Sequence, residues 1–237
     1  MTAPAIELLA VSKGYHGIRP LRIEALTVGA GEQVAILGLD QPMAEVLVNL
    51  LTGATLPDRG EVRVLGRSTA AIQDSAEWLS MVDRFGVVSL RAVLLEQLSA
   101  IQNLAIPFTL DVEPPPAPVR EQAEELAREV ELSQQGWTRA VAELGPFDQA
   151  RVRLGRALAL DPAILLIEHA SAAIPAAHQT AFGRAVRRIA SRRGSAMLAF
   201  TADRTFAEAV APRVLALEAA TGRLTGLRGP LSHLFGR

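Results

Sequence analysis

Short apolar runs alternate with longer amphipathic segments along most of this chain. The predicted strands cover Ala5–Val11, Leu21–Val28, Gln33–Leu37, Glu61–Leu65, Phe85–Val88, Ala163–Ile167, Ser195–Phe200 and Arg213–Leu217. Between the strands, apolar residues recur at helical spacing. The predicted helices cover Met43–Thr52, Leu98–Pro107, Val119–Glu131, Asp148–Leu160, Ala177–Arg192 and Arg204–Val210. Strands that alternate with helices predict an α/β fold with a mostly parallel sheet covered on both faces.

One long stretch departs from this alternation. Residues 91–145 carry helical patterns without a strand, and the prolines of residues 111–118 predict an extended connector inside the stretch. We therefore expect a single domain over residues 1–237 with a helical insertion at 91–145. Residues 1–30 and 60–66 predict a small β lobe, and residues 226–237 predict a flexible tail.

Composition and charge narrow the class of protein. Of the 237 residues, 49% are hydrophobic and 21% are charged, which favours a globular fold over disorder. The net charge of −1 gives no electrostatic reason to expect a nucleic-acid partner. The chain has no cysteine, so it forms no disulfide and no thiolate metal site. No signal-peptide pattern and no apolar run of about 18 residues occurs, so we expect a cytoplasmic protein that reaches a membrane only through a partner.

The segment around Gly38 has the layout of a phosphate-binding loop. An apolar strand runs into Gly38, a short polar loop follows, and an amphipathic helix ends at Gly53. In the motif G-x-x-x-x-G-K-[ST], the lysine reaches the phosphates and the hydroxyl binds Mg²⁺. Here Met43 stands at the second glycine, Ala44 at the lysine and Glu45 at the hydroxyl. The frame of a nucleotide site is present without its usual side chains.

The charges of this loop disfavour the binding of phosphate. The only lysine of the chain is Lys13, and no arginine lies within residues 38–49. We expect Glu45 in the first turn of the helix, where its carboxylate would interact with the positive end of the helix dipole in place of a phosphate. Pro42 suits a first helical position and removes one backbone donor.

The order of segments resembles the nucleotide-binding subunit of ATP-binding cassette (ABC) transporters over essentially the whole chain. The resemblance rests on Ser12–Tyr15, Gly31–Gly38, Leu50–Gly53, Pro57–Gly66, Arg151–Pro162 and Ile164–Ile167. It implies a P-loop NTPase core of the ABC type with a small antiparallel β lobe and an inserted helical lobe. Because many segments match in order, no single motif carries the resemblance.

At the family's catalytic positions, the resemblance places different residues. Glu168 corresponds to the Mg²⁺-linked aspartate, His169 to the glutamate that polarises water, and Ala202 to the switch histidine. The signature sequence falls on Leu144–Asp148, with Gly145 at its serine and Pro146 and Phe147 at its two glycines. The glutamine of the loop between the core and the helical lobe falls on Leu90.

The resemblance assigns a vestigial nucleotide site to Tyr15, Gly38, Ala44, Glu45 and Val46. Tyr15 either stacks on adenine, as the family's aromatic does, or simply covers the small N-terminal sheet.

Two residues near the end of the predicted strand 163–167 also have alternative interpretations. Glu168 either binds Mg²⁺ or is a solvated acid at the strand end. His169 could act as a base, but nothing in the sequence fixes its tautomer, so we predict no catalytic residue there.

We therefore expect an ABC ATP-binding subunit with little or no ATP binding or hydrolysis. Any cofactor would be ATP with Mg²⁺. The resemblance implies a membrane permease as partner, with a homodimer or a heterodimer with an active ABC subunit. We expect Leu98, Ile101 and Ile106 to offer the partner an apolar surface. The alternatives are a weakly active ABC ATPase and an ABC-like scaffold or regulator outside transport.

Overall fold

A computed structural model describes residues 3–15, 17 and 19–227 of the chain. The first part of the fold is an antiparallel sheet in the strand order β2-β1-β4-β5. Its strands are β1 (Ile6–Lys13), β2 (Leu21–Val28), β4 (Arg59–Val64) and β5 (Arg67–Ser68). This sheet is the small β lobe expected from the sequence.

A second sheet forms the centre of the molecule, in the order β10-β9-β3-β8-β7-β6. Its strands are β3 (Gln33–Leu37), β6 (Phe85–Ser89), β7 (Ile164–Glu168), β8 (Ala196–Thr201), β9 (Arg213–Glu218) and β10 (Arg223–Gly226). The strands from β9 to β6 are parallel, and only β10 pairs antiparallel. The carboxyl ends of β3, β6 and β7 therefore lie at the same end of the sheet.

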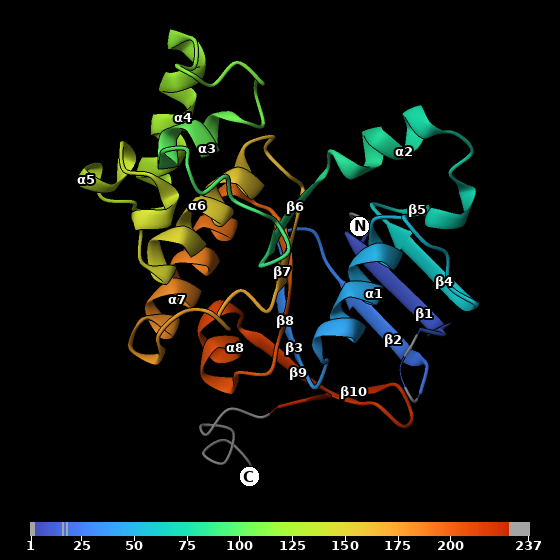
Figure 1. Cartoon of the computed structure of the whole chain (residues 1–237). Helices are drawn as coiled ribbons and strands as arrows, with labels where there is room; N and C mark the ends of the chain where they lie inside the picture. Colours follow the sequence, from blue (N-terminus) through green and yellow to red (C-terminus); the bar gives the residue numbers. More distant parts are fainter. Residues whose placement is uncertain (1–2, 16, 18, 228–237) are drawn as a thin grey trace.

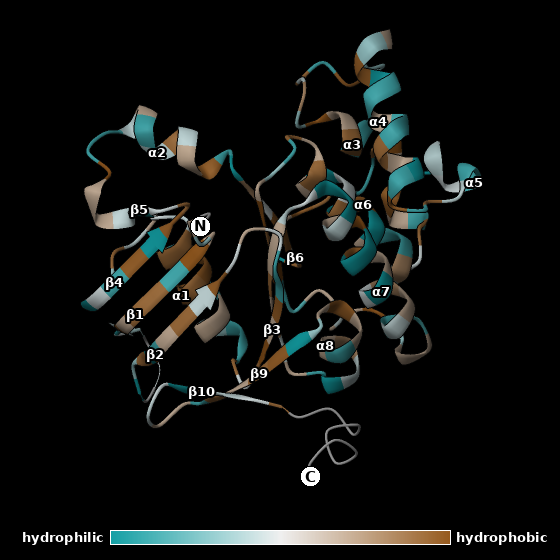
Figure 2. Ribbon diagram, turned by 180° about the vertical axis from the view of Figure 1, so that it is seen from behind, coloured by the Kyte–Doolittle hydropathy of each residue, from teal (hydrophilic) through white to brown (hydrophobic). Residues whose placement is uncertain are grey.

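Helices cover both faces of this central sheet. The helices are α1 (Gln41–Leu51), α2 (Ser75–Val82), α3 (Ala100–Ala105), α4 (Ala117–Glu129), α5 (Gln134–Trp137), α6 (Pro146–Leu158), α7 (Ala176–Arg193) and α8 (Arg204–Val210). Figure 1 shows α1 between the two sheets, and α6, α7 and α8 on the opposite side of the central sheet. In Figure 2, α4 and α6 carry both hydrophilic and hydrophobic residues, as expected for helices with one buried face.

The side chains of β7 enter two separate cores in alternation. Ile164 and Leu166 pack with α1 and the antiparallel sheet, whereas Leu165 and Ile167 pack with the helices on the other face. Successive side chains of a strand point to opposite faces, and both faces of this sheet are covered, so the strand is apolar throughout.

The predicted fold class is confirmed, and the predicted strands begin and end within two residues of the observed ones. The structure adds α2, α5, β5 and β10, which the sequence patterns did not predict. The expectation that residues 111–118 cannot be helical is wrong at the end of the segment. Helix α4 begins at Ala117, with Pro118 in its first turn, where the missing N–H of proline has no helical partner to lose. Residues 228–237 of the expected tail lie outside the described residues.

Candidate functional site

The loop between β3 and α1 is tightly constrained by its neighbour β9. Gly38 has φ +94°, and a Cβ atom at this position would lie 2.9 Å from the carbonyl oxygen of Leu217. Only glycine fits without strain in this conformation and at this distance. The chain therefore makes the sharp turn of a phosphate-binding loop before it enters α1.

Asp40 is the residue that caps α1, and this corrects two expectations from the sequence. Its carboxylate accepts a hydrogen bond from the Met43 N–H at 2.8 Å. Glu45 is the fifth residue of the helix and does not lie in its first turn, and Pro42 is the second residue, not the first. The helix begins earlier than predicted because Asp40 is a strong N-cap residue. The negative charge at the positive end of the dipole is thus that of Asp40.

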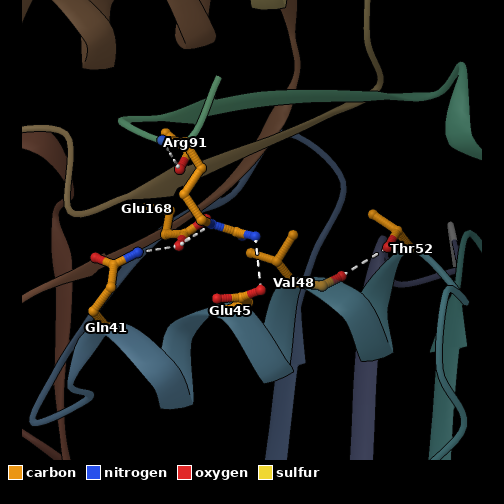
Figure 3. Close-up of polar contacts among 7 residues, drawn as sticks. Gln41, Glu45, Val48, Thr52, Arg91 and Glu168 are labelled. Carbon is orange, nitrogen blue, oxygen red and sulfur yellow. Dashed lines mark hydrogen bonds and ion pairs between the residues drawn. The ribbon is translucent and has the colours of Figure 1, made fainter. Parts of the chain in front are cut away.

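A single arginine joins the two acidic residues of the site. The Arg91 guanidinium donates from Nε to Glu168 Oε1 at 3.0 Å and from Nη2 to Glu168 Oε2 at 2.7 Å. Its Nη1 lies 3.0 Å from Glu45 Oε1. Gln41 Nε2 also donates to Glu168 Oε1. We call Gln41, Glu45, Arg91 and Glu168 the Arg91 network (Figure 3).

Burial makes Glu168 the centre of this network. The side chain of Glu168 is 0% exposed, so the interpretation of it as a solvated acid is wrong. A buried carboxylate requires a partner for its charge, and Arg91 supplies one in a bidentate geometry. The side chain of Arg91 is 41% exposed. The hydrogen bond to Glu168 raises the pKa of Arg91 above its ordinary value.

Sequence reasoning missed Arg91, although one signal could have found it. Arg91 lies two residues beyond Ser89, the last residue of β6, and Ser89 pairs with Glu168 in the register of β6 and β7. Neighbouring parallel strands bring their carboxyl ends together, so the position next to Leu90 is within reach of the end of β7. The loop itself, residues 38–49, contains no arginine, so the cation comes from outside it.

In this arrangement, the residues at the predicted nucleotide site do not fit a Mg²⁺ ion and the phosphate groups that it would accompany. Both Glu168 oxygens accept hydrogen bonds from protein donors. The Met43 N–H is bonded to Asp40, and Pro42 has no N–H to offer a phosphate. Within residues 3–15, 17 and 19–227, no cluster of three or more His, Asp or Glu side chains could hold a metal ion. The positions that the resemblance assigns to the two metal ligands are Glu45 and Glu168, and an arginine already binds both.

Two other residues of the predicted site point into the core. Ala44 is fully buried among the residues between α1 and the central sheet, and Val46 packs against the same core. A lysine at position 44 would therefore have to pass its aliphatic stem through packed side chains. Position 44 is therefore part of the hydrophobic core between α1 and the central sheet.

Tyr15 lines a cavity of about 610 Å³ beside the loop, together with Asp40, Pro42 and Met43. The tyrosine thus lies next to the start of α1, where the resemblance places the nucleotide base. Burial, and then the negative charge of Asp40, raise the pKa of its phenol. Stacking on a ligand and covering of the sheet are both compatible with this position.

His169 and Ala202 do not join the Arg91 network. The His169 backbone has φ +45° and donates its N–H to the carbonyl oxygen of Phe200 at 2.9 Å. Within the described part of the chain, His169 Nε2 is buried and has no hydrogen-bond partner. Ala202 is exposed and has no group that could take part in proton transfer.

The residues at the signature position form a packed corner at the start of α6. Phe147 stacks on His178 of α7 with ring centroids 4.8 Å apart, and the Arg151 guanidinium lies over the Phe147 ring, 4.0 Å from its centroid. Gly145 caps the helix and Pro146 is its first residue. Proline and a packed aromatic ring thus stand at the two positions where the family pattern has glycines.

The apolar surface at Leu98, Ile101 and Ile106 is smaller than expected. Ile101 is buried, and Leu98 and Ile106 are partly buried against the core of the helical lobe. The exposed large apolar side chains of this region lie elsewhere. They are Leu90, Val93, Leu95, Leu110 and Leu160.

Comparison with known proteins agrees with the observed fold. The sequence model of the ABC transporter family matches residues 22–172. CysA of Methylococcus capsulatus, a sulfate/thiosulfate import ATP-binding protein, is 29% identical over 222 residues, which are 91% of this chain and 61% of CysA. The dimeric structure of MJ0796, a bacterial ABC transporter cassette, superposes with a TM-score of 0.76 at 24% identity, over 94% of this chain and 99% of that one. CbiO1 of Clostridium perfringens, part of the ABC transporter complex cbiONQ, has a TM-score of 0.78 at 16% identity, over 94% and 87% of the two chains.

These matches define the fold as an ABC cassette of the P-loop NTPase class. The family match covers more than half of the residues, and the chain belongs to the ABC transporter family. The chain spans about three fifths of the length of curated relatives such as CysA. Among the described residues, no helix is long and apolar enough to cross a bilayer.

Proposed function

We propose that this chain is an ABC transporter subunit that works with a membrane permease while binding and hydrolysing little or no ATP. The observation that carries the proposal is the Arg91 network. One guanidinium contacts Glu45 and Glu168, the two side chains at the metal-ligand positions of the family. A protein that transfers phosphoryl groups acts mainly by neutralising charge with a cation and a metal. Here the protein's own arginine neutralises its own carboxylates.

The charges near the loop support the same proposal. Asp40 places a carboxylate at the N-terminus of α1, where a phosphate would otherwise be favoured. The lysine that would balance a triphosphate is replaced by the buried Ala44. The chain's only lysine, Lys13, pairs with Asp58 at 2.8 Å.

The transport role rests on the relatives. CysA is named for import, CbiO1 is part of a transporter complex, and MJ0796 is described as a dimer. By analogy, this chain acts at the cytoplasmic face of a membrane through a permease, as a homodimer or beside an active ABC subunit. Paired with an active subunit, it would contribute to one shared site the corner at Gly145–Asp148, and to the other the loop between β3 and α1. Neither of these carries the family's usual residues.

Calorimetric titration of the purified protein with MgATP tests the nucleotide part of the proposal. We expect no binding heat at concentrations up to about 1 mM, a limit that corresponds to roughly 4 kcal/mol of binding free energy. An active ABC cassette titrated in the same buffer serves as the positive control. Micromolar binding, or turnover near about 1 s⁻¹, would show that the chain is a working ATPase and would overturn this part.

Purification of the tagged chain from its native membrane tests the transport part. Recovery of a multi-span membrane protein, identified by mass, is the expected result. Recovery of only soluble partners would instead support a scaffold or regulator outside transport.

A further inference from the structure

A cavity of about 610 Å³ lies where three segments of the chain meet. These segments are the turn between β1 and β2, the start of α1 and the turn after β9. Sites for small ligands usually measure roughly 300–1,000 Å³ and combine apolar walls with a few polar groups. The cavity has this size and this kind of wall. Its lining includes Tyr15, Gly17, Arg19, Asp40, Met43 and Ala219.

Two opposite charges line the cavity without pairing with each other. Arg19 and Asp40 are both exposed, and neither forms an ion pair with a residue that the structure describes. The hydrogen bond from the Met43 N–H occupies Asp40 Oδ1, so Asp40 Oδ2 can accept a hydrogen bond from a ligand. The cavity therefore offers donors for one anionic group and an acceptor for one cationic group.

The Tyr15 ring gives the cavity its aromatic surface. Tyr15 is partly buried and packs against the core between α1 and the antiparallel sheet. Gly17 lies close to the ring, because a Cβ atom at position 17 would be 2.5 Å from Tyr15 Cε2. Burial, and after it the negative charge of Asp40, raises the pKa of the Tyr15 phenol, so the carboxylate lies near the ring. A ligand that stacks on Tyr15 is therefore also close to Asp40.

We infer that this cavity binds an amino acid with an aromatic side chain, in its zwitterionic form. Arg19 donates to the carboxylate of the ligand, since a guanidinium binds a carboxylate through two parallel hydrogen bonds. Asp40 accepts a hydrogen bond from the ammonium group of the ligand. The ring of the ligand stacks on Tyr15, and Met43 adds an apolar contact from the start of α1.

The same charges disfavour simpler ligands of similar size. An aromatic carboxylate without an ammonium group would be repelled by Asp40, and an aromatic amine without a carboxylate would be repelled by Arg19. A nucleotide with its base on Tyr15 would bring its phosphates to the loop after β3, where Asp40 caps α1. The inference therefore rests on the nucleotide part of the proposed function, which leaves the cavity to another ligand.

Calorimetric titration of the full chain with related probes tests the inference. L-Tryptophan should bind with a Kd below about 1 mM. Indolepropionate, which lacks the ammonium group, and tryptamine, which lacks the carboxylate, should each bind at least about fivefold more weakly. The inference is overturned if tryptophan gives no saturable heat up to about 10 mM, or if the three probes bind equally well.

Charge variants show which protein group binds each end of the ligand. Asp40→Asn retains a good capping residue for α1 and should remove the advantage of tryptophan over indolepropionate. Arg19→Gln should remove the advantage of tryptophan over tryptamine. The matched controls, which should leave all affinities unchanged, are Asp74→Asn at the cap of α2 and Arg184→Gln at an exposed position of α7. Preferences that persist in well-folded Asp40→Asn and Arg19→Gln variants would overturn the inference.

The stacking contact has a test of its own. Tyr15→Leu keeps an apolar side chain but removes the aromatic ring, so it should weaken the binding of tryptophan about threefold or more. Tyr15→Phe keeps the ring and should bind tryptophan as the unmodified chain does. Equal affinity of the unmodified chain and a folded Tyr15→Leu variant would overturn the assignment of Tyr15 as the stacking residue.

The outcomes distinguish this inference from the proposed function. If neither tryptophan nor MgATP binds, the inference is overturned and the nucleotide part of the proposed function stands. If adenosine binds and tryptophan does not, the cavity is a nucleoside site and the inference is overturned. If both tryptophan and micromolar MgATP bind, only the nucleotide part of the proposed function is overturned.

Discussion

Arg91 holds both carboxylate oxygens of Glu168, at 3.0 and 2.7 Å. Within the described part of the chain, Glu168 is the one charged side chain that is buried. Its partner comes from the connector to the helical lobe, 77 positions earlier in the chain. The contact therefore joins two parts of the fold and neutralises a charge that the core could not otherwise accept.

The first prediction concerns the stability that this contact provides. Arg91→Ala should lower the free energy of unfolding by about 2 kcal/mol. Breaking a fully buried pair costs roughly 3–5 kcal/mol, and the value is smaller here because Arg91 is 41% exposed. Urea denaturation measures the change. Arg120→Ala, which removes an exposed pair with Glu124, should change stability by no more than about 0.5 kcal/mol.

A double-mutant cycle isolates the interaction. Glu168→Gln removes the buried charge, so adding Arg91→Ala to it should cost much less than Arg91→Ala costs in the unmodified protein. Equal costs in both backgrounds would mean that the ion pair contributes nothing beyond the packing of Arg91.

The second prediction compares the stability contributed by Asp40, which caps α1, with that contributed by Glu45 in the second turn of the same helix. Asp40→Ala should destabilise the protein by about 1 kcal/mol, because the Met43 N–H loses its acceptor. Glu45→Ala should cost about 0.3 kcal/mol, because its pair with Arg91 is exposed on both sides. Thermal or urea unfolding gives the comparison, and the reverse order would mean that Glu45 stabilises the start of α1 more than Asp40 does.

The third prediction tests which residues block nucleotide binding. The triple variant Met43→Gly, Ala44→Lys and Glu45→Ser should bind ATP at least about tenfold more tightly than the unmodified chain, a gain of about 1.4 kcal/mol. Its affinity should be the same with Mg²⁺ and with a chelator, because Arg91 still occupies Glu168. Adding Arg91→Gln should make the affinity depend on Mg²⁺.

Folding is the control for these variants. Ala44 is fully buried, so Ala44→Lys alone should destabilise the protein by about 1–3 kcal/mol through overpacking. A folded quadruple variant that gains no dependence on Mg²⁺ would show that Arg91 is not what keeps the metal out.

The fourth prediction concerns acid stability. The Asp58 carboxylate accepts hydrogen bonds from the Gly14 N–H and from Lys13 Nζ, which lower its pKa below the ordinary 3.8. A lowered pKa in the folded state gives stability that is present above the unfolded-state pKa and is lost as the pH falls through the folded-state value.

Comparison with Asp58→Asn reveals this contribution. The unmodified protein should be more stable than the variant near pH 7, and the difference should shrink below about pH 5. A difference that stays constant down to pH 2 would contradict the lowered pKa.

The strands and the long helices could be predicted because their patterns are local. Strands β2 and β3 and helix α8 have the predicted bounds, since each apolar run ends at a turn residue or a charged residue. Helix α2 was not predicted, and it has no buried residue to create an apolar stripe.

The Arg91 network could not be predicted because it depends on contacts between distant segments. The sequence gives no distance between residues 45, 91 and 168, although the order of parallel strands limits the choice. The burial of Glu168 could not be predicted for the same reason. A buried carboxylate is stable only beside its partners Arg91 and Gln41, and these lie far from Glu168 in the sequence.

The ion pair between Arg91 and Glu168 restricts how the helical lobe can move. The connector that carries Arg91 joins β6 of the central sheet to residues 91–145, so a rotation of these residues relative to the sheet would have to move Arg91. Any such rotation would pull the guanidinium away from a carboxylate that water cannot reach. The helical lobe and the central sheet should therefore move together as one rigid body, held by the ion pair between Arg91 and Glu168.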